Sequence, residues 1–281
     1  MRDLEIGLAW GTLHRAGLVE FIDLAARHGF PTLAVPPHIY EAALAAGETP
    51  RSLRRRLADG GVRVRVIDCI AAGMPGMPPG ETVVDSQPIR QYDAAECLAI
   101  ADALEAPVIN ISLYNSKPVP VAEMAEAVGD VCRLAGSGHS IVIEFYPESG
   151  ITDLAAADAI ARACGEGNCG VMLDVWHLAR SGGTVQQVAD LSPGAIGALQ
   201  LSDRTDPPPG TPYVPMSGRR LPGEGELPLG ALVAAALANS PSITAEIEVF
   251  SAELAALPLE MAAARTAAAV RAWRERLSGE G

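Results

Sequence analysis

The sequence contains no long apolar run, no C-x-x-C pair and no excess of basic residues. No stretch approaches the roughly 18 consecutive apolar residues of a membrane-spanning helix. The first residues, MRDLEIGLAWGTL, lack a basic segment followed by an apolar core, so no secretory signal peptide is expected. The odd number and loose spacing of the cysteines favour reduced thiols, and therefore a cytoplasmic protein. These cysteines are Cys69, Cys97, Cys132, Cys164 and Cys169.

The balance of charge is strongly acidic. The chain of 281 residues carries 34 acidic and 21 basic side chains, a formal net charge of −13. Such a surface repels phosphate backbones and anionic lipid headgroups, so neither a nucleic acid nor a membrane is an expected partner. A small-molecule substrate is the expected partner, and the outer helices could also support a homodimer.

Short β-rich runs alternate along the chain with Ala- and Leu-rich helical runs. Eight strands are predicted, at Leu4–Ala9, Thr32–Val35, Val62–Cys69, Val108–Leu113, Ile141–Phe145, Gly170–Val175, Ile196–Leu201 and Ile243–Phe250. Most are continuously apolar, as in parallel sheets covered on both faces. No G-x-G-x-x-G follows the first strand, which weakens the case for a nucleotide-binding open sheet. Eight units favour one (β/α)₈ TIM barrel over residues 1–281.

Helical patterns fill the gaps between these strands. They are predicted at Val19–His28, Arg51–Asp59, Ile89–Leu104, Val121–Ala135, Leu154–Cys164, Val185–Ala189 and Leu229–Ala238, with a C-terminal helix at about 252–278. Two long segments, Ala71–Pro88 and Asp203–Pro228, follow the third and seventh strands. Active sites of TIM barrels lie at that end of the strands, so we expect both segments to form walls or covers of a pocket. Disordered surface insertions are the alternative.

Polar residues stand where the predicted strands end. Glu144 follows Ile141-Val142-Ile143, and Asp174 and Gln200 occupy similar places on the next two strands. Glu246 and Glu248 on the eighth strand are two residues apart and so share a face. In a closed barrel these side chains could converge on one point. Taken singly, a strand-end carboxylate is more often paired with an arginine than bound to a metal.

Three carboxylates cannot share a small site without a compensating positive charge. A divalent cation resolves this repulsion. The predicted ligands Glu144, Asp174, Gln200 and Glu248 all offer oxygen atoms, which favours one Mn²⁺ or Mg²⁺ ion over zinc.

Five segments resemble the xylose-isomerase-like TIM-barrel superfamily of sugar phosphate isomerases and epimerases. They are IEFYPESG at 143–150, MLDVWHLARSGG at 172–183, LQLSDR at 199–204, RRLPGEGELPL at 219–229 and EIEVFS at 246–251. The N-terminal half matches only in its alternation of elements. The resemblance implies that Glu144, Asp174, Gln200 and Glu248 bind the metal. It favours Glu248 over Glu246, because the E-V-F-S pattern aligns with Glu248.

Further residues are candidates for the site, and the resemblance itself implies a role for His177. His177, at a strand end or entering a loop, would bind or protonate the substrate; a packed structural histidine is the alternative. Arg219 and Arg220 would bind an anionic group from a lid, unless they are only solvated surface residues. Asp203 would orient a ligand or hold Arg204, and Glu246 remains a further substrate-binding candidate. His38 and Asn110 could line the pocket.

The expected reaction is proton abstraction next to a carbonyl, giving an enediolate that the metal stabilises. Glu144 or Glu248 would act as the base. The leading hypothesis is an isomerase or epimerase acting on a small, sugar-like hydroxy-ketone. Many relatives carry histidine where this chain has Gln200, whereas some 3-dehydroshikimate dehydratases carry glutamine. A metal-dependent lyase of that type is therefore the alternative reaction, and a non-catalytic metal-binding barrel is the alternative class.

Overall fold

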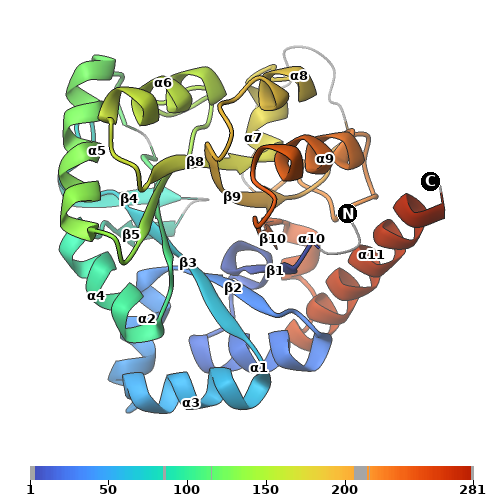
Figure 1. The fold of residues 1–281 in the computed structure, drawn as a ribbon. Coiled ribbons are helices and arrows are strands. Elements are labelled where there is room, and N and C mark those ends of the chain that lie inside the picture. Colours follow the sequence, from blue (N-terminus) through green and yellow to red (C-terminus); the bar gives the residue numbers. More distant parts are fainter. Residues whose placement is uncertain (1–3, 85–86, 115, 206–213, 215, 280–281) are drawn as a thin grey trace.

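A closed barrel of eight parallel strands forms the centre of the protein in the computed structural model (Figure 1). The structure describes residues 4–84, 87–114, 116–205, 214 and 216–279. The strand order around the barrel is β1-β10-β9-β8-β7-β6-β3-β2. The strands are β1 (Ile6–Ala9), β2 (Thr32–Val35), β3 (Arg63–Ile70), β6 (Val108–Ile111), β7 (Ser140–Ile143), β8 (Cys169–Asp174), β9 (Ile196–Leu201) and β10 (Ala245–Ile247). The predicted single (β/α)₈ barrel is confirmed.

Helices cover the outside of this barrel (Figure 1). They are η1 (Trp10–Leu13), α1 (Leu18–His28), α2 (Pro37–Ala45), α3 (Pro50–Gly60), α4 (Ala94–Leu104), α5 (Val121–Ala135), α6 (Leu154–Cys164), α7 (Val175–Arg180), α8 (Val185–Ala189), α9 (Leu229–Asn239), α10 (Ala252–Ala255) and α11 (Leu259–Gly279). Their apolar stripes and the outward side chains of the strands form one continuous core.

Several predicted boundaries were wrong. The segment Ala71–Pro88 is not only a loop, because β4 (Glu81–Val84) and β5 (Gln87–Arg90) pair in it as an antiparallel hairpin. The helix predicted from Ile89 begins at Ala94, where Asp93 and Glu96 form a reciprocal cap. The predicted C-terminal helix at 252–278 is two helices, α10 and α11, separated by a break that contains Pro258.

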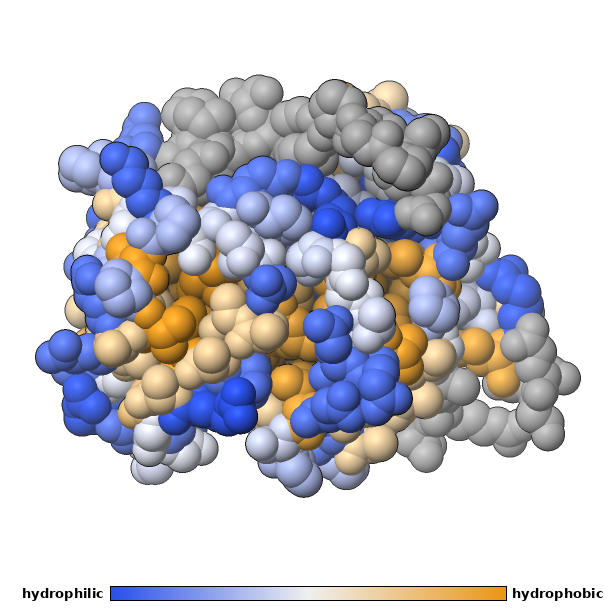
Figure 2. Space-filling model, turned by 90° about the horizontal axis from the view of Figure 1, so that it is seen from above, coloured by the Kyte–Doolittle hydropathy of each residue, from blue (hydrophilic) through white to orange (hydrophobic). Residues whose placement is uncertain are grey.

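The interior of the barrel is filled by side chains. A layer of small and branched apolar residues lies inside it: Ala9, Ala34, Val66, Val108, Val142, Met172 and Ala198. Such a layer makes the barrel a packed core and leaves room for polar groups only towards the strand ends. None of the described helices has the length and apolar character needed to cross a membrane. Hydrophilic residues cover most of the protruding parts of the face in Figure 2, and hydrophobic ones lie in recesses between them.

Candidate metal centre and its pocket

The strand ends bring the four predicted ligands to the mouth of the barrel. Glu144 directly follows β7, Asp174 and Gln200 lie in β8 and β9, and Glu248 directly follows β10. Asp174 and Gln200 are neighbours in the parallel register, and the Gln200 Nε2 donates to the Glu248 Oε1 at 3.2 Å. All four side chains are buried. The predicted convergence of these residues is therefore present.

His177 joins this group through a short helix. Asp174 is the N-cap of α7, and its Oδ1 accepts from the backbone N–H of Trp176 at 2.7 Å and of His177 at 3.1 Å. This turn places the His177 Nε2 at 3.7 Å from both the Glu144 Oε1 and the Asp174 Oδ2. His177 thus lies on a helix, not at a strand end or in a loop as predicted. Glu144, Asp174 and His177 offer ligand atoms within 4.8 Å of one another, a possible metal site.

Arg219 is the cation that the structure places against these carboxylates. Its NH1 donates to the Asp174 Oδ2 at 2.9 Å and lies 3.2 Å from the Glu248 Oε2. The guanidinium also lies 4.6 Å from the centre of the Trp176 ring, a cation–π distance. Burial acts to raise the pKa of Asp174, but the charge of Arg219, the nearby His177 and the hydrogen bonds from the backbone N–H groups of Trp176 and His177 together lower that pKa. Asp174 is therefore a stable carboxylate.

Asp203 fixes the loop that carries Arg219. The backbones of Asp203 and Arg220 exchange two hydrogen bonds, of 2.7 and 2.6 Å. The Asp203 carboxylate accepts from four backbone N–H groups, those of Arg204, Gly223, Gly225 and Leu227. A β-carbon on Gly225 would lie 2.4 Å from the Asp203 Oδ1, so only glycine fits that approach. Both Asp203 oxygens are engaged within the loop, so its contacts make it a positioning residue rather than a ligand for substrate.

The two adjacent arginines face opposite ways. Arg219 is buried at the barrel mouth. The side chain of Arg220 is 45% exposed and lies 3.8 Å from Glu253 at the surface. The backbone hydrogen bonds between Arg220 and Asp203 fix the chain at this point, so that the Arg219 side chain points inward and the Arg220 side chain points outward. The rest of the predicted cover, residues 206–213 and 215, lies outside the described residues.

Glu246 does not join the cluster at the mouth. Its Oε1 accepts from Thr32, at the start of β2, at 3.0 Å, and from Thr244 at 3.3 Å. Both partners lie at the N-terminal ends of strands, inside the barrel and below the mouth. Burial raises the pKa of Glu246 to about 7. The structure thus separates the two glutamates that share a face: Glu248 lies with the other predicted ligands, and Glu246 lies deeper.

Asp68 is a site residue that sequence reasoning missed. It lies near the end of β3, and its Oδ1 accepts from the Asn110 Nδ2 at 2.8 Å. The same Asn110 nitrogen donates to the Glu144 Oε2 at 2.9 Å, so it links the two carboxylates. The signal was available, because Asp68 follows the apolar Val66-Ile67 just as Glu144 follows its strand.

The mouth therefore holds four carboxylates, from Asp68, Glu144, Asp174 and Glu248, around one arginine. Burial, then the charges of Asp68 and Asp174, raises the pKa of Glu144 to about 8. Burial also raises the pKa of Glu248 well above its usual range, despite Arg219. Protonation of these groups, or a bound cation, would relieve the repulsion.

The ligand atoms of the site suit a divalent cation. Among the described residues, the buried Glu144 Oε1 and Gln200 Oε1 have no hydrogen-bond partner. Leaving such oxygen atoms unpaired is costly in a buried site, and both could coordinate a metal ion. Burial lowers the pKa of His177 to about 3, so the imidazole is neutral and able to act as a ligand.

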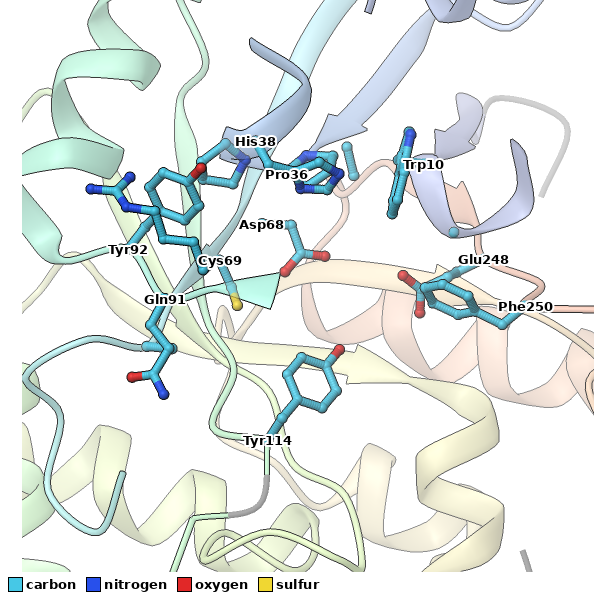
Figure 3. A pocket seen from close by; sticks show the side chains of 15 residues that line it. Trp10, Pro36, His38, Asp68, Cys69, Gln91, Tyr92, Tyr114, Glu248 and Phe250 are labelled. Carbon is cyan, nitrogen blue, oxygen red and sulfur yellow. The ribbon is translucent and has the colours of Figure 1, made fainter. Parts of the chain in front are cut away.

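A pocket opens beside these groups, with about 690 Å³ of empty space that includes the open solvent at its entrance. In Figure 3 the Asp68 and Glu248 carboxylates point into it, with Trp10 and Phe250 on one side and Tyr92 on the other. The His38 ring packs edge-on against Trp10 at 4.6 Å between centroids. The pocket thus has a polar floor at the strand ends and a largely aromatic wall, which suits a small ligand with several oxygen atoms.

Comparison with known proteins defines the class of this barrel. The family model of the xylose isomerase-like TIM barrel matches residues 22–276. The chain therefore belongs to the xylose isomerase-like TIM barrel family, as its motifs predicted.

Individual relatives are distant. A curated protein of Streptomyces coelicolor described as a "Putative hydroxypyruvate isomerase" is 23% identical over 200 residues, 65% of this chain and 67% of the relative. A solved xylose isomerase-like TIM barrel/4-hydroxyphenylpyruvate dioxygenase fusion protein is 18% identical, with a TM-score of 0.78 over 99% of this chain but only 44% of the fusion protein. The IOLI protein with a bound zinc atom is 16% identical, with a TM-score of 0.76 over 94% of this chain and 96% of that one.

Enzymes that catalyse different reactions share this fold. The similar structures include a D-psicose 3-epimerase, 16% identical with a TM-score of 0.70 over 98% of this chain and 99% of that one. They also include the probable 3-DHS dehydratase AsbF from Bacillus anthracis, 12% identical with a TM-score of 0.72 over 95% of this chain and 99% of that one. Identities this low show the fold alone.

Proposed function

We propose that this protein is a divalent-metal-dependent isomerase or epimerase acting on a small, sugar-like hydroxy-ketone. The observation that carries the proposal is the buried group of Glu144, Asp174, His177, Gln200 and Glu248 beside an open pocket. Membership of the xylose isomerase-like family and the similarity to an isomerase and to epimerases support it.

The metal would be held by Glu144 and Asp174 together with His177, Gln200 or Glu248. When bound, it supplies Lewis-acid polarisation of a substrate carbonyl. The predicted all-oxygen set favours Mn²⁺ or Mg²⁺. The proximity of the His177 nitrogen favours Mn²⁺ over Mg²⁺ and also accommodates zinc, the metal bound by the similar IOLI structure.

The side chains of this protein would move the proton. Glu248 lines the pocket, and the buried Glu144 Oε1, which has no hydrogen-bond partner among the described residues, lies 3.7 Å from the His177 Nε2. A carboxylate whose pKa lies near neutrality is well matched to removing and returning a carbon-bound proton. In the metal-free protein, burial and the charges of Asp68 and Asp174 raise the pKa of Glu144 to about 8, and a bound cation would lower it towards neutrality. Arg219 and His177 would bind the developing negative charge on substrate oxygen.

A lyase of the 3-dehydroshikimate dehydratase type is the second candidate. Gln200 favours it, because the resemblance associates glutamine at this position with such dehydratases. The similarity to AsbF is consistent with this reading at the level of the fold. Both reactions begin with the same proton abstraction and differ in whether a hydroxyl group then leaves.

Nuclear magnetic resonance in D₂O distinguishes the two reactions. The purified protein would first be loaded with Mn²⁺, Mg²⁺ or Zn²⁺, and its metal content would be measured. It would then be assayed with hydroxypyruvate, ketohexoses and 3-dehydroshikimate. Rearranged product supports the isomerase or epimerase, and loss of water supports the lyase.

Substitutions test the two glutamates. Deuterium is expected to enter the reacting carbon only if Glu144 and Glu248 are intact. Glu144→Gln and Glu248→Gln should therefore abolish turnover, whereas Glu123→Gln, at an exposed position, should not. Failure to bind any divalent ion would contradict both reactions.

A further inference from the structure

Three cysteines come together at the end of the barrel opposite the mouth. Cys132 lies in α5, Cys164 is the last residue of α6, and Cys169 is the first residue of β8. Their sulfur atoms all lie within 4.8 Å of one another. We call these three residues the thiol cluster. α5 and α6 lie side by side on the outside of the barrel (Figure 1), so the cluster lies where two helices meet the start of a strand.

The thiol cluster is remote from the candidate metal centre. Cys169 and Asp174 are the first and last residues of β8. Five residue steps at about 3.3 Å each separate their α-carbons by roughly 17 Å. The apolar layer inside the barrel, which includes Met172 of β8, lies between the two levels. The cysteines therefore serve no part of the proposed reaction.

The spacing of the sulfur atoms matches a shared metal ion. A metal about 2.3 Å from each sulfur holds two thiolates about 3.8–4.0 Å apart, at tetrahedral or trigonal angles. The Cys132 and Cys164 sulfurs are 4.0 Å apart. A disulfide would need about 2.05 Å, so these thiols would have to move further to form one.

The surrounding backbone holds the cluster in place. The Asn168 Nδ2 donates to the carbonyl oxygens of Cys132, Gly136 and His139, at 3.0, 2.9 and 3.2 Å. This amide joins the end of α5 to the residue before Cys169. Gly165 ends α6 in the left-handed conformation, with φ 72°, directly after Cys164. The three sulfurs are therefore presented by a braced turn.

Solvent can reach the thiol cluster. Cys132 is buried, whereas Cys164 and Cys169 are partly exposed, so an ion has access and a fourth position can remain open to water. Three thiolates around a divalent ion leave one net negative charge. Arg133, next to Cys132, lies at the cluster's edge, where its NH1 bonds to Glu166 at 2.7 Å. Because Arg133 also pairs with Asp130 at 2.6 Å, its charge is already neutralised, and the remaining negative charge of the site would be screened by solvent on its partly exposed side.

We propose that Cys132, Cys164 and Cys169 form a second metal site, specific for a thiophilic d¹⁰ cation such as Zn²⁺, that clasps α5, α6 and β8 together. Thiolate sulfur selects soft and borderline cations, in contrast to the carboxylates at the mouth. Each thiol loses its proton as it binds.

Cadmium is the probe for this site, because thiolate-to-cadmium charge transfer absorbs in the ultraviolet. The titration uses reduced, metal-free protein carrying Glu144→Gln, which weakens the mouth site. We expect one Cd²⁺ equivalent with a charge-transfer band and displacement by Zn²⁺. Changes beyond the direct ligands already cost about 10- to 100-fold in metal affinity. Cys164→Ser and Cys169→Ser should therefore bind at least about tenfold more weakly, and the buried Cys97→Ser should bind like the parent.

A second measurement needs no substitution. Alkylation of the wild-type protein followed by mass spectrometry should show Cys164 and Cys169 protected when Zn²⁺ is present and modified when it is absent. Absence of a charge-transfer band, unchanged binding by both serine variants, or equal alkylation with and without Zn²⁺ would each overturn the proposal. So would a disulfide between two of the three cysteines in protein saturated with Zn²⁺.

Discussion

The two ends of strand β8 carry opposite kinds of chemistry. Asp174 at its C-terminal end lies among buried carboxylates, an amide, a neutral imidazole and an arginine. Cys169 at its N-terminal end lies among thiols that are partly open to solvent. At the mouth, the candidate ligands converge inside the barrel from several strand ends. At the opposite end, two of the three cysteines come from helices outside the barrel, and the third is the first residue of β8. The packed interior thus separates two sets of candidate ligands that differ in hardness.

The largest effect on stability is expected from removing Arg219, whose positive charge compensates the carboxylates at the mouth. Arg219→Ala leaves Asp174 and Glu248 without their cation, and breaking a buried pair in this way costs about 3–5 kcal/mol. We expect that loss in the free energy of unfolding of metal-free protein, measured with urea. Adding Mn²⁺ should recover more stability in the variant than in the wild type. An equal gain in both would show that Arg219 does not share the role of the metal, and the thiol cluster should be unaffected throughout.

Glu144→Gln should weaken metal binding at the mouth and leave metal binding at the thiol cluster unchanged. The substitution keeps the shape of the side chain but removes a charged ligand from the mouth. We expect Mn²⁺ binding to weaken by more than about 100-fold, while Cd²⁺ binding at the thiol cluster stays within about twofold of wild type. Isothermal titration calorimetry measures both affinities. Parallel loss of both would mean that the two sites are coupled.

Asp203→Asn tests whether the loop positions Arg219. An amide cannot accept from four N–H groups as the carboxylate does, and charged hydrogen bonds contribute about 1.5–3 kcal/mol each. We expect the free energy of unfolding to fall by about 2 kcal/mol. Activity should fall through a lower kcat, since Arg219 would lose its fixed place. Mn²⁺ affinity should rise modestly, because a displaced Arg219 competes less well for Asp174. Unaltered kcat in a folded variant would contradict this positioning role.

The smallest effect on stability is expected from a substitution of Glu246, inside the barrel. Because the pKa of Glu246 is raised from 4.5 to about 7, its protonated form favours the folded state below about pH 4.5. That contribution is lost as the pH rises through about 7. Glu246→Gln removes the dependence, so above pH 7 the variant should be more stable than the wild type by at least about 1 kcal/mol, the equivalent of one pKa unit. Urea unfolding at pH 5 and pH 8 measures the difference. A variant that is less stable at pH 8 would contradict the assignment.

The fold could be predicted because its signal is repeated. Most strands are apolar runs buried on both sides, and the strand–helix alternation occurs eight times. The helices missed are short or lie in segments with turn residues: α7 has six residues, and α2 begins at Pro37 directly after a strand. A single turn of helix gives no periodicity to detect. The β4–β5 hairpin escaped because Gly, Pro and Met around it read as a loop.

The site could be predicted only in part, for a physical reason. Glu144 and Asp174 stand out because a charge follows an apolar strand. Arg219 and Arg220 are adjacent in a loop, and only the bridge from Asp203 to Arg220 decides which one turns inward. The thiol cluster joins residues 132, 164 and 169 from three elements, and no local spacing reveals that their sulfurs meet.

The two carboxylate oxygens of Asp174 have different partners, and this affects how a metal ion could bind. Oδ1 is held by the backbone of α7, so only Oδ2 faces the barrel mouth. Arg219 already occupies that oxygen. A metal ion that reaches Asp174 must therefore share one atom with the guanidinium or take its place. If the ion takes the place of Arg219, loading of the mouth would exchange one cation for another, and the positive charge gained there would be smaller than the charge of the entering ion.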